Sequence, residues 1–169
     1  MEVFMTDNGD SLLRILLSGR VDGAIILHSG FLKNHEKLLL DSELPTVFLD
    51  REIGKSHVSS VLFDSYQTGR MAAEYLYSLG HRRMMTLKGA DTFDGIERQR
   101  GFEDYLNEKG CPLDPGYSLR GDFDRWVAYG EMKRFLENRK SLPDAIFAAN
   151  DDSAFGCMKA LSEEGYKIP

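Results

Sequence analysis

The segment from Val58 to Leu87 limits the possible folds most strongly, because it has the pattern of a strand, a helix and a second strand. Its first part, Val58–Phe63, is rich in apolar and β-branched residues, as a buried strand is. Asp64 then stands where a helix N-cap is expected, and Gly80 stands where a glycine in the left-handed conformation would end the helix. Two strands joined by a crossover helix form a parallel βαβ unit, so the segment predicts a parallel sheet.

The helix between Asp64 and Gly80 is expected to carry one apolar face. Small residues line the first half of this face, so we expect the helix to lie close on a sheet. The apolar positions recur at the spacing i, i+3, i+4 and i+7, and they are Gly69, Ala72, Ala73, Leu76 and Leu79.

The rest of the chain repeats the alternation of strand and helix, which is the pattern of an α/β protein with doubly wound parallel sheets. Further strands are expected at 2–6, 23–27, 46–49, 84–88, 117–119 and 145–149, and further helices at 11–18, 33–41, 96–109, 125–138 and 153–164. The polar segment 52–57 is expected to link part of an N-terminal lobe, 1–57, to a C-terminal lobe, 58–169. Because the pattern opens on a strand and stops where another strand is due, we expect the fold to be incomplete at both ends.

Composition and charge exclude several classes of protein. The 169 residues are 42% hydrophobic and 28% charged, which is ordinary for a globular protein of one domain or two small lobes. A formal net charge of −6 argues against this chain itself holding a DNA duplex by phosphate neutralisation. The apolar run Leu12–Leu17 is too short for a signal peptide or a membrane span and is broken by Arg14. Cys111 and Cys157 have no CxxC spacing, so we expect reduced thiols and a cytoplasmic protein.

No catalytic or cofactor motif is present in the sequence. There is no G-x-G-x-x-G after a strand, no P-loop and no G-x-S-x-G. Asp151 and Asp152 form an acid pair without a neighbouring nucleophile, and His28, His35 and His57 lack the spacing of metal ligands. We therefore expect no enzyme, no cofactor and no metal site.

Polar and aromatic residues follow the ends of several expected strands. In open parallel sheets, ligands bind outside the carboxyl ends of the strands. Carboxylates, an amide, an arginine and aromatic rings at this edge suit a small polyhydroxylated or heterocyclic ligand, held by polar groups and covered by an aromatic face. The residues at this edge are His28, Ser29, Asp50, Arg51, Phe63, Asp64, the loop 89–95, Phe123 and Asn150–Asp152.

Four of these residues, and also Arg98, have a purely structural interpretation as well. Asp50 could be a strand-end cap, and Asn150 is most simply the N-cap of the last helix. Phe63 and Phe123 would in most proteins be core residues, and a single Arg98 at a helix start is more often solvated than part of a ligand site.

Five segments together resemble the effector domains of the lactose-repressor/galactose-repressor (LacI/GalR) transcription factors. The segment that opens this section fits D-x-x-x-x-G-x-x-A-A-x-x-L-x-x-x-G-H-R-R, from Asp64 to Arg83. The other four are VDGAII at 21–26, PTVFLDR at 45–51, RQRGF at 98–102, and AND at 149–151 with Ala154 and Gly156. They occur in the family's order and cover nearly the whole chain.

The resemblance implies a periplasmic-binding-protein-like fold of type I, with two flavodoxin-like lobes. By position it implies ligand contacts from Asp50, Phe63, Arg98, Phe123 and Asn150. It also implies a sensor for a small sugar or nucleobase-like effector, in a homodimeric repressor. DNA would be bound only through a helix-turn-helix that lies outside this chain. An exported sugar-binding protein of the same fold is the alternative, and neither the effector nor the operator follows from the sequence.

Overall fold

A computed structural model describes residues 8–27, 33–53, 58–138 and 141–168. The chain divides into two compact units, Met1–Phe63 and Asp64–Pro169. The expected strand at 2–6 and the candidate ligand residue Ser29 lie outside the described residues.

The first unit contains a three-stranded parallel sheet with the order β1-β2-β3. Side chains from both of its helices pack with Ile26, Phe48 and Val58 in one buried cluster, so the helices lie on the same face of the sheet. On the other face, Ile25 is 72% exposed. The elements are α1 (Gly9–Leu16), β1 (Ala24–Ile26), α2 (Lys33–Asp41), β2 (Thr46–Leu49) and β3 (Val58–Val61).

Strand β3 belongs to the first unit and not to the second, which differs from the expected boundary after residue 57. Val58 pairs with Thr46, and Val61 with Leu49, in parallel register with β2. These backbone hydrogen bonds hold β3 in the first sheet, so the division falls between Phe63 and Asp64. The segment Val58–Leu87 is therefore not one βαβ unit of a single sheet, because its two strands lie in different sheets.

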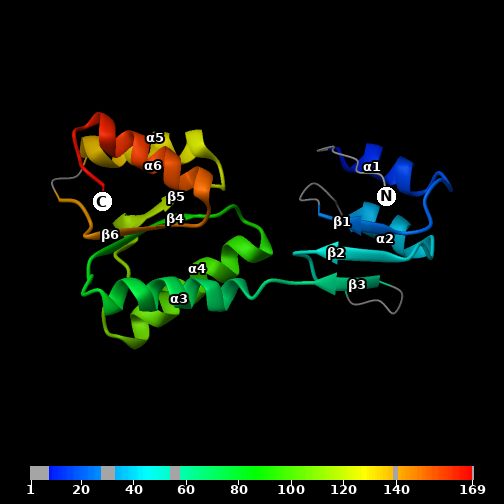
Figure 1. The fold of residues 1–169 in the computed structure, drawn as a ribbon, viewed down its shortest axis with the longest axis horizontal. Helices are drawn as coiled ribbons and strands as arrows, with labels where there is room; N and C mark the ends of the chain where they lie inside the picture. Colours follow the sequence, from blue (N-terminus) through cyan, green and yellow to red (C-terminus); the bar gives the residue numbers. More distant parts are fainter. Residues whose placement is uncertain (1–7, 28–32, 54–57, 139–140, 169) are drawn as a thin grey trace. The chain divides into compact units, whose positions relative to one another are not determined.

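The second unit is a doubly wound α/β layer structure around a parallel sheet with the order β5-β4-β6. Figure 1 shows α3 and α4 on one face of this sheet and α5 and α6 on the other. The elements are α3 (Ser65–Ser78), β4 (Met84–Lys88), α4 (Phe93–Glu108), the 3-10 turn η1 (Pro115–Tyr117), β5 (Ser118–Arg120), α5 (Arg125–Asn138), β6 (Ala145–Ala148) and α6 (Asp151–Glu163). The predicted fold class, with parallel sheets in two lobes, is confirmed.

Alternation along β4 gives the second unit two cores, one on each face of its sheet. Met84 packs with Ala73, Phe102, Tyr105 and Leu106 of α3 and α4. Met85 and Leu87 point to the other face and pack with α5 and α6, in a cluster that includes Tyr117, Ala128, Met132, Phe135, Cys157, Ala160 and Leu161.

Local signals at the helix ends act as expected. The Asp64 carboxylate accepts a hydrogen bond from the Gln67 N–H at 2.8 Å, and Asp124 accepts from the Trp126 N–H at 2.8 Å. Gly80 adopts a φ of +94° after α3. The small residues of α3 differ from expectation, because Gly69 faces the backbone of α4 and not the sheet. Leu79, expected on the apolar face, is 57% exposed.

None of the described helices combines the length and the hydrophobicity that a membrane-spanning helix needs.

Candidate functional site

Three of the predicted ligand residues meet where the strands of the second sheet end. Arg98 lies on α4, which follows β4; Phe123 follows β5 and Asn150 follows β6. The Arg98 guanidinium carbon lies 5.9 Å from the centroid of the Phe123 ring. The Asn150 amide donates a hydrogen bond to the Phe123 carbonyl oxygen at 3.0 Å. An arginine, an aromatic ring and an amide thus form one cluster at this edge.

The Arg98 guanidinium has hydrogen-bonding or charged partners at its two terminal nitrogens but none at Nε in the described part of the chain. Its Nη1 donates to the Ala149 carbonyl oxygen, and its Nη2 lies 4.0 Å from the Asp94 carboxylate. Among the described residues, Nε of Arg98 is the one buried side-chain nitrogen or oxygen without a hydrogen-bond partner. A buried donor without an acceptor costs roughly 1–3 kcal/mol, more when charged. An acceptor on a bound molecule would remove this penalty.

The Phe123 ring is fixed by an unusual backbone and a glycine. Asp122 and Phe123 both have positive φ, +51° and +60°. The N–H groups of Gly121 and Asp122 donate to the Lys88 carbonyl at the end of β4, at 2.9 and 3.0 Å. A Cβ atom on Gly89 would lie 2.4 Å from the Phe123 ring, so the ring occupies the space that a larger residue would fill.

Left-handed backbone recurs at the strand ends. Four described residues other than glycine have positive φ. Three of them, Asp50, Asp122 and Phe123, lie just after β2 or β5, and the fourth is Glu43. Such strain concentrates at binding sites in proteins and persists only where the surrounding structure enforces it.

Asn150 has the structural role that its sequence position suggests, and a second role as well. Its Oδ1 accepts a hydrogen bond from the Ser153 N–H at 3.0 Å and caps α6. Its Nδ2 donates a hydrogen bond to the Phe123 carbonyl oxygen, and Ser153 Oγ donates to the Gly121 carbonyl oxygen at 3.4 Å. Asn150 and Ser153 thus tie the start of α6 to the loop that carries Phe123.

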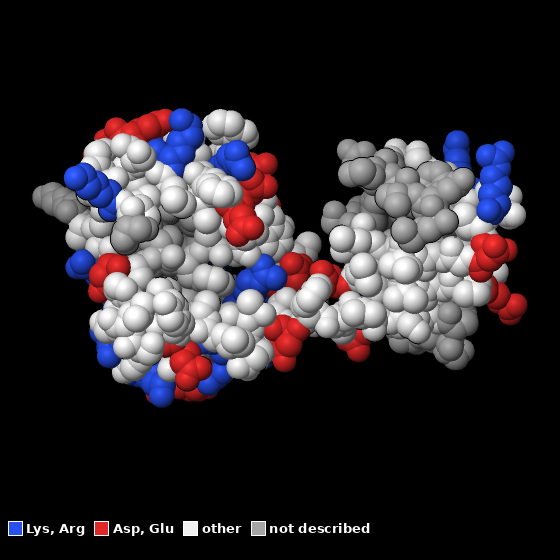
Figure 2. All heavy atoms as spheres, viewed as in Figure 1, with Lys and Arg blue, Asp and Glu red and all other residues white. Residues whose placement is uncertain are grey.

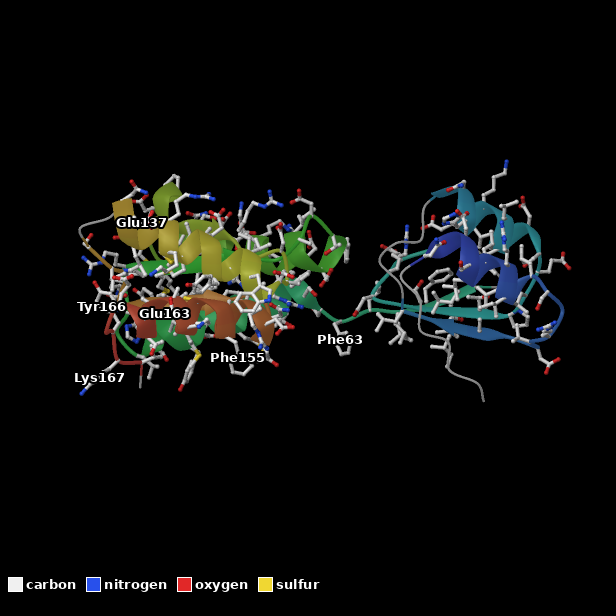
Figure 3. The ribbon with its side chains drawn as sticks, turned by 90° about the horizontal axis from the view of Figure 1, so that it is seen from above. Phe63, Glu137, Phe155, Glu163, Tyr166 and Lys167 are labelled. Carbon is white, nitrogen blue, oxygen red and sulfur yellow. The ribbon has the colours of Figure 1, made fainter. Side chains whose placement is uncertain are left out.

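Asp50 and Phe63 belong to the first unit. Asp50 has a φ of +55°, and its N–H donates to the Val61 carbonyl at 2.9 Å. Its neighbour Arg51 forms an ion pair with Glu36. Phe63 is 72% exposed, so it is not the core residue that aromatic side chains usually are. Figure 3 shows its ring extending from the segment between β3 and α3.

Charged side chains near the Arg98 cluster form ion pairs. Figure 2 shows carboxylates gathered with basic groups at the end of the second unit where its strands end. Arg125 pairs with Asp152 at 2.7 Å. Arg120 pairs with Asp122, and this hydrogen bond raises the pKa of the Arg120 guanidinium. Within the described residues no group of three His, Cys, Asp or Glu side chains could hold a metal ion.

The loop 89–95 was expected at this edge of the sheet, but the contacts that its residues and Gly121 make were not. Gly89 makes room for the Phe123 ring, and Gly121 approaches the Lys88 carbonyl. Asp94 lies one helical turn before Arg98. The i,i+4 spacing of Asp94 and Arg98 was a readable signal, whereas the glycine contacts depend on segments far apart in the sequence.

Fold and cluster together define a ligand-binding domain of the periplasmic-binding-protein type. The family model described as periplasmic binding proteins and sugar binding domain of LacI family matches residues 3–169. The chain belongs to this family, and the resemblance seen in its motifs is confirmed.

Curated relatives are transcriptional repressors by name. The chain is 30% identical over 159 residues to the HTH-type transcriptional repressor PurR of Actinobacillus pleuropneumoniae serotype 5b (strain L20), covering 93% of this chain and 47% of the relative. It is 27% identical over 152 residues to the probable HTH-type transcriptional repressor ExuR of Bacillus subtilis (strain 168), covering 89% and 45%. The chain thus spans about half the length of these relatives.

Solved structures of the family share the fold. A sugar-binding transcriptional regulator of the LacI family from Escherichia coli, complexed with phosphate, superposes with a TM-score of 0.79 at 30% identity, over 95% of this chain and 58% of that one. The transcriptional regulator CelR in complex with cellobiose gives a TM-score of 0.80 at 29% identity, over 95% and 50%.

Proposed function

We propose that this chain is the small-molecule effector-binding domain of a LacI-type transcriptional repressor. The observation that carries the proposal is the Arg98 guanidinium, which is anchored on Ala149 and has a buried, unpartnered Nε beside the Phe123 ring. Repressor relatives and a cellobiose-bound neighbour support this use of the cluster.

The effector class that suits the cluster is a small sugar or a nucleobase-like molecule. The guanidinium supplies donors in a plane, which suits hydroxyl, carbonyl or ring-nitrogen acceptors. The Phe123 ring offers an apolar face to a sugar or a heterocycle. Asp50 and Phe63 of the first unit complete the proposed contact set, and Ser29 belongs to it by sequence position.

The proposed response is a change in the arrangement of the two units. An effector shifts such an equilibrium only by its differential affinity for the two arrangements. Because its net charge is −6, this chain by itself is not suited to bind the negatively charged phosphates of DNA. DNA binding is therefore assigned to a helix-turn-helix segment, as the names of the relatives state for them, and the protein is proposed to act in the cytoplasm.

We also propose that the protein works as a homodimer. Trp126 on α5 is 64% exposed and Phe155 on α6 is 54% exposed, and these helices pack together. The guanidinium carbon of Arg125 lies 5.3 Å from the centroid of the Phe155 ring, and Figure 3 shows this ring on the outer side of α6. Aromatic residues and arginine are enriched at protein interfaces. Trp126→Ser is expected to weaken dimerisation in sedimentation analysis, and an unchanged mass would contradict this placement.

Effector binding can be tested by calorimetry with cellobiose, galactose and hypoxanthine as probes. Arg98→Ala is expected to weaken binding roughly 10–150-fold, the equivalent of a lost charged hydrogen bond of about 1.5–3 kcal/mol. Arg134→Ala is the matched control, because Arg134 is an exposed arginine on α5 that pairs with Glu131. Equal affinities for Arg98→Ala and the wild type would refute the assignment of Arg98.

A further inference from the structure

Helices α3 and α4 cross in direct backbone contact at two glycines. A Cβ atom on Gly69 of α3 would lie 1.9 Å from the carbonyl oxygen of Arg98 on α4. A Cβ atom on Gly101 of α4 would lie 1.9 Å from the carbonyl oxygen of Tyr66 on α3. The two contacts are reciprocal, so neither helix can carry a side chain at this point without moving the other.

One of the two contacts is made by the backbone of Arg98 itself. Its side chain then runs to the end of the sheet, where Nη1 reaches the Ala149 carbonyl and the guanidinium lies beside Phe123. Real Cβ atoms essentially never come closer than 3.0 Å to such a neighbour. An alanine at Gly69 would therefore displace the Arg98 carbonyl by about 1 Å. The Arg98 guanidinium, which is hydrogen-bonded to the Ala149 carbonyl oxygen, would then have to move as well.

We propose that Gly69 and Gly101 are positioning residues for Arg98: the depth of the α3–α4 crossing sets where the guanidinium lies. The inference rests on the proposed function only in that Arg98 is the effector-binding arginine. The position of Arg98 itself can be measured without any effector.

A purely structural role for the glycines is the competing explanation. Other contacts also hold the two helices together. The Arg70 guanidinium makes two hydrogen bonds to the Glu108 carboxylate, at 2.7 and 2.6 Å, and the Tyr66 hydroxyl donates to Asp104 at 3.0 Å. If the glycines only allowed close packing, their substitution would lower stability and leave the Arg98 side chain where it is.

The position of Arg98 can be followed by NMR through its Nε–Hε cross-peak. Arg98→Lys assigns the peak, because lysine has no such group. Gly69→Ala and Gly101→Ala are expected to shift or broaden it. Gly110→Ala is the matched control, because Gly110 follows the far end of α4 with a φ of +69°, which strains an alanine, while a Cβ atom there would meet nothing within 4 Å.

The expected result is a peak that moves in both α3–α4 variants and stays in place in Gly110→Ala, with a lower urea midpoint in all three. An unmoved peak in folded Gly69→Ala, or an equal shift in Gly110→Ala, would overturn the inference. If the alanine variants do not fold, Ala73→Gly loosens the same packing without a clash, since Ala73 is fully buried with Phe102. It is expected to broaden the peak, and a sharp, unshifted peak would overturn the inference.

Cellobiose binding separates this inference from the proposed function. Where the wild type binds cellobiose, Gly69→Ala is expected to weaken binding at least tenfold. If the wild type binds cellobiose and the Arg98 peak is unmoved in the glycine variants, the inference fails and the function stands. If the peak moves and the wild type binds no effector probe, the positioning role stands and the function loses its support.

Discussion

The amide group of Asn150 joins two loops by bonding in both directions. Its Nδ2 donates to the Phe123 carbonyl oxygen at 3.0 Å, across 27 positions in the sequence, while its Oδ1 accepts from the Ser153 N–H at 3.0 Å. The Asn150 side chain thus caps α6 and also holds Phe123, whose backbone has a positive φ of +60°. The loop after β5 and the start of α6 are thereby fixed as one structure.

Substitution of Asn150 should reveal both bonds. Asn150→Ala loses the cap and the Phe123 contact and should lower the free energy of unfolding by about 2 kcal/mol, about 1 for each bond. Asn150→Asp keeps an acceptor for the cap but cannot donate to Phe123, so it should lose about half as much. Urea unfolding measures both. Equal losses for the two variants would show that the cap bond contributes nothing, and no loss in Asn150→Asp would show the same of the Phe123 bond.

Much of the second unit was predictable because its signals are local. Asp64, Asp124 and Asn150 are short polar side chains before amphipathic runs, and each caps its helix as the sequence suggests. The glycine ends are equally local, as at Gly80 and Gly165, where φ is positive. Helix α4 begins at Phe93, three residues before the expected start, because Thr92 and not a later residue is its N-cap.

The boundary between the units was not predictable from composition. A polar segment at 52–57 suggested a link, yet β3 is held in the first sheet by pairing with β2. Nothing in the composition of Val58–Val61 states which sheet it joins, because strand pairing depends on partners elsewhere in the chain. The same reason explains why Gly69 was expected against a sheet and was found against α4.

The positions of the candidate residues at strand ends were predictable, but the contacts between them were not. The rule on strand ends and the family resemblance both named Phe123 and Asn150, and the resemblance added Arg98. The unpartnered Nε of Arg98 depends on which acceptors lie near it in space. The contact between Gly89 and the Phe123 ring joins segments more than thirty positions apart in the sequence, so no local pattern contains it.

Phe63 offers a test of the contact set in the first unit. Because its side chain is 72% exposed, Phe63→Ala should change the free energy of unfolding by less than about 0.5 kcal/mol. If Phe63 covers a bound effector, the same variant should bind that effector more weakly in calorimetry. Tyr75→Ala, which removes another exposed aromatic ring, should leave affinity unchanged. A large loss of stability in Phe63→Ala would mean that the ring packs against the protein.

The Arg70–Glu108 pair gives a pH-dependent prediction. The hydrogen bonds from Arg70 hold the pKa of Glu108 below its ordinary value of 4.5. Since the folded pKa is the lower one, the stabilisation is present above 4.5 and is lost as the pH falls through the folded pKa. Carboxyl-carbon NMR should show Glu108 titrating below 4.5 in the wild type and closer to it in Arg70→Gln. Arg134→Gln should leave the Glu108 titration unchanged, and a shift there would point to long-range charge effects.

Cys157 should make the protein less stable in alkaline solution. The side chain is 3% exposed, and burial raises the pKa of its thiol from 9.0 to about 12. Because the folded pKa is the higher one, the thiol contributes stability below pH 9 that is lost as the pH rises toward 12, by at most about 1.4 kcal/mol per pH unit. Urea unfolding at pH 8 to 11 should therefore show a steeper loss for the wild type than for Cys157→Ala, which has no thiol to ionise. Parallel curves for the two proteins would mean that the folded thiol titrates like an exposed one.

Alkylation by iodoacetamide checks the burial of the Cys157 thiol independently. Cys157 should react more slowly than the partly exposed Cys111 in the native protein.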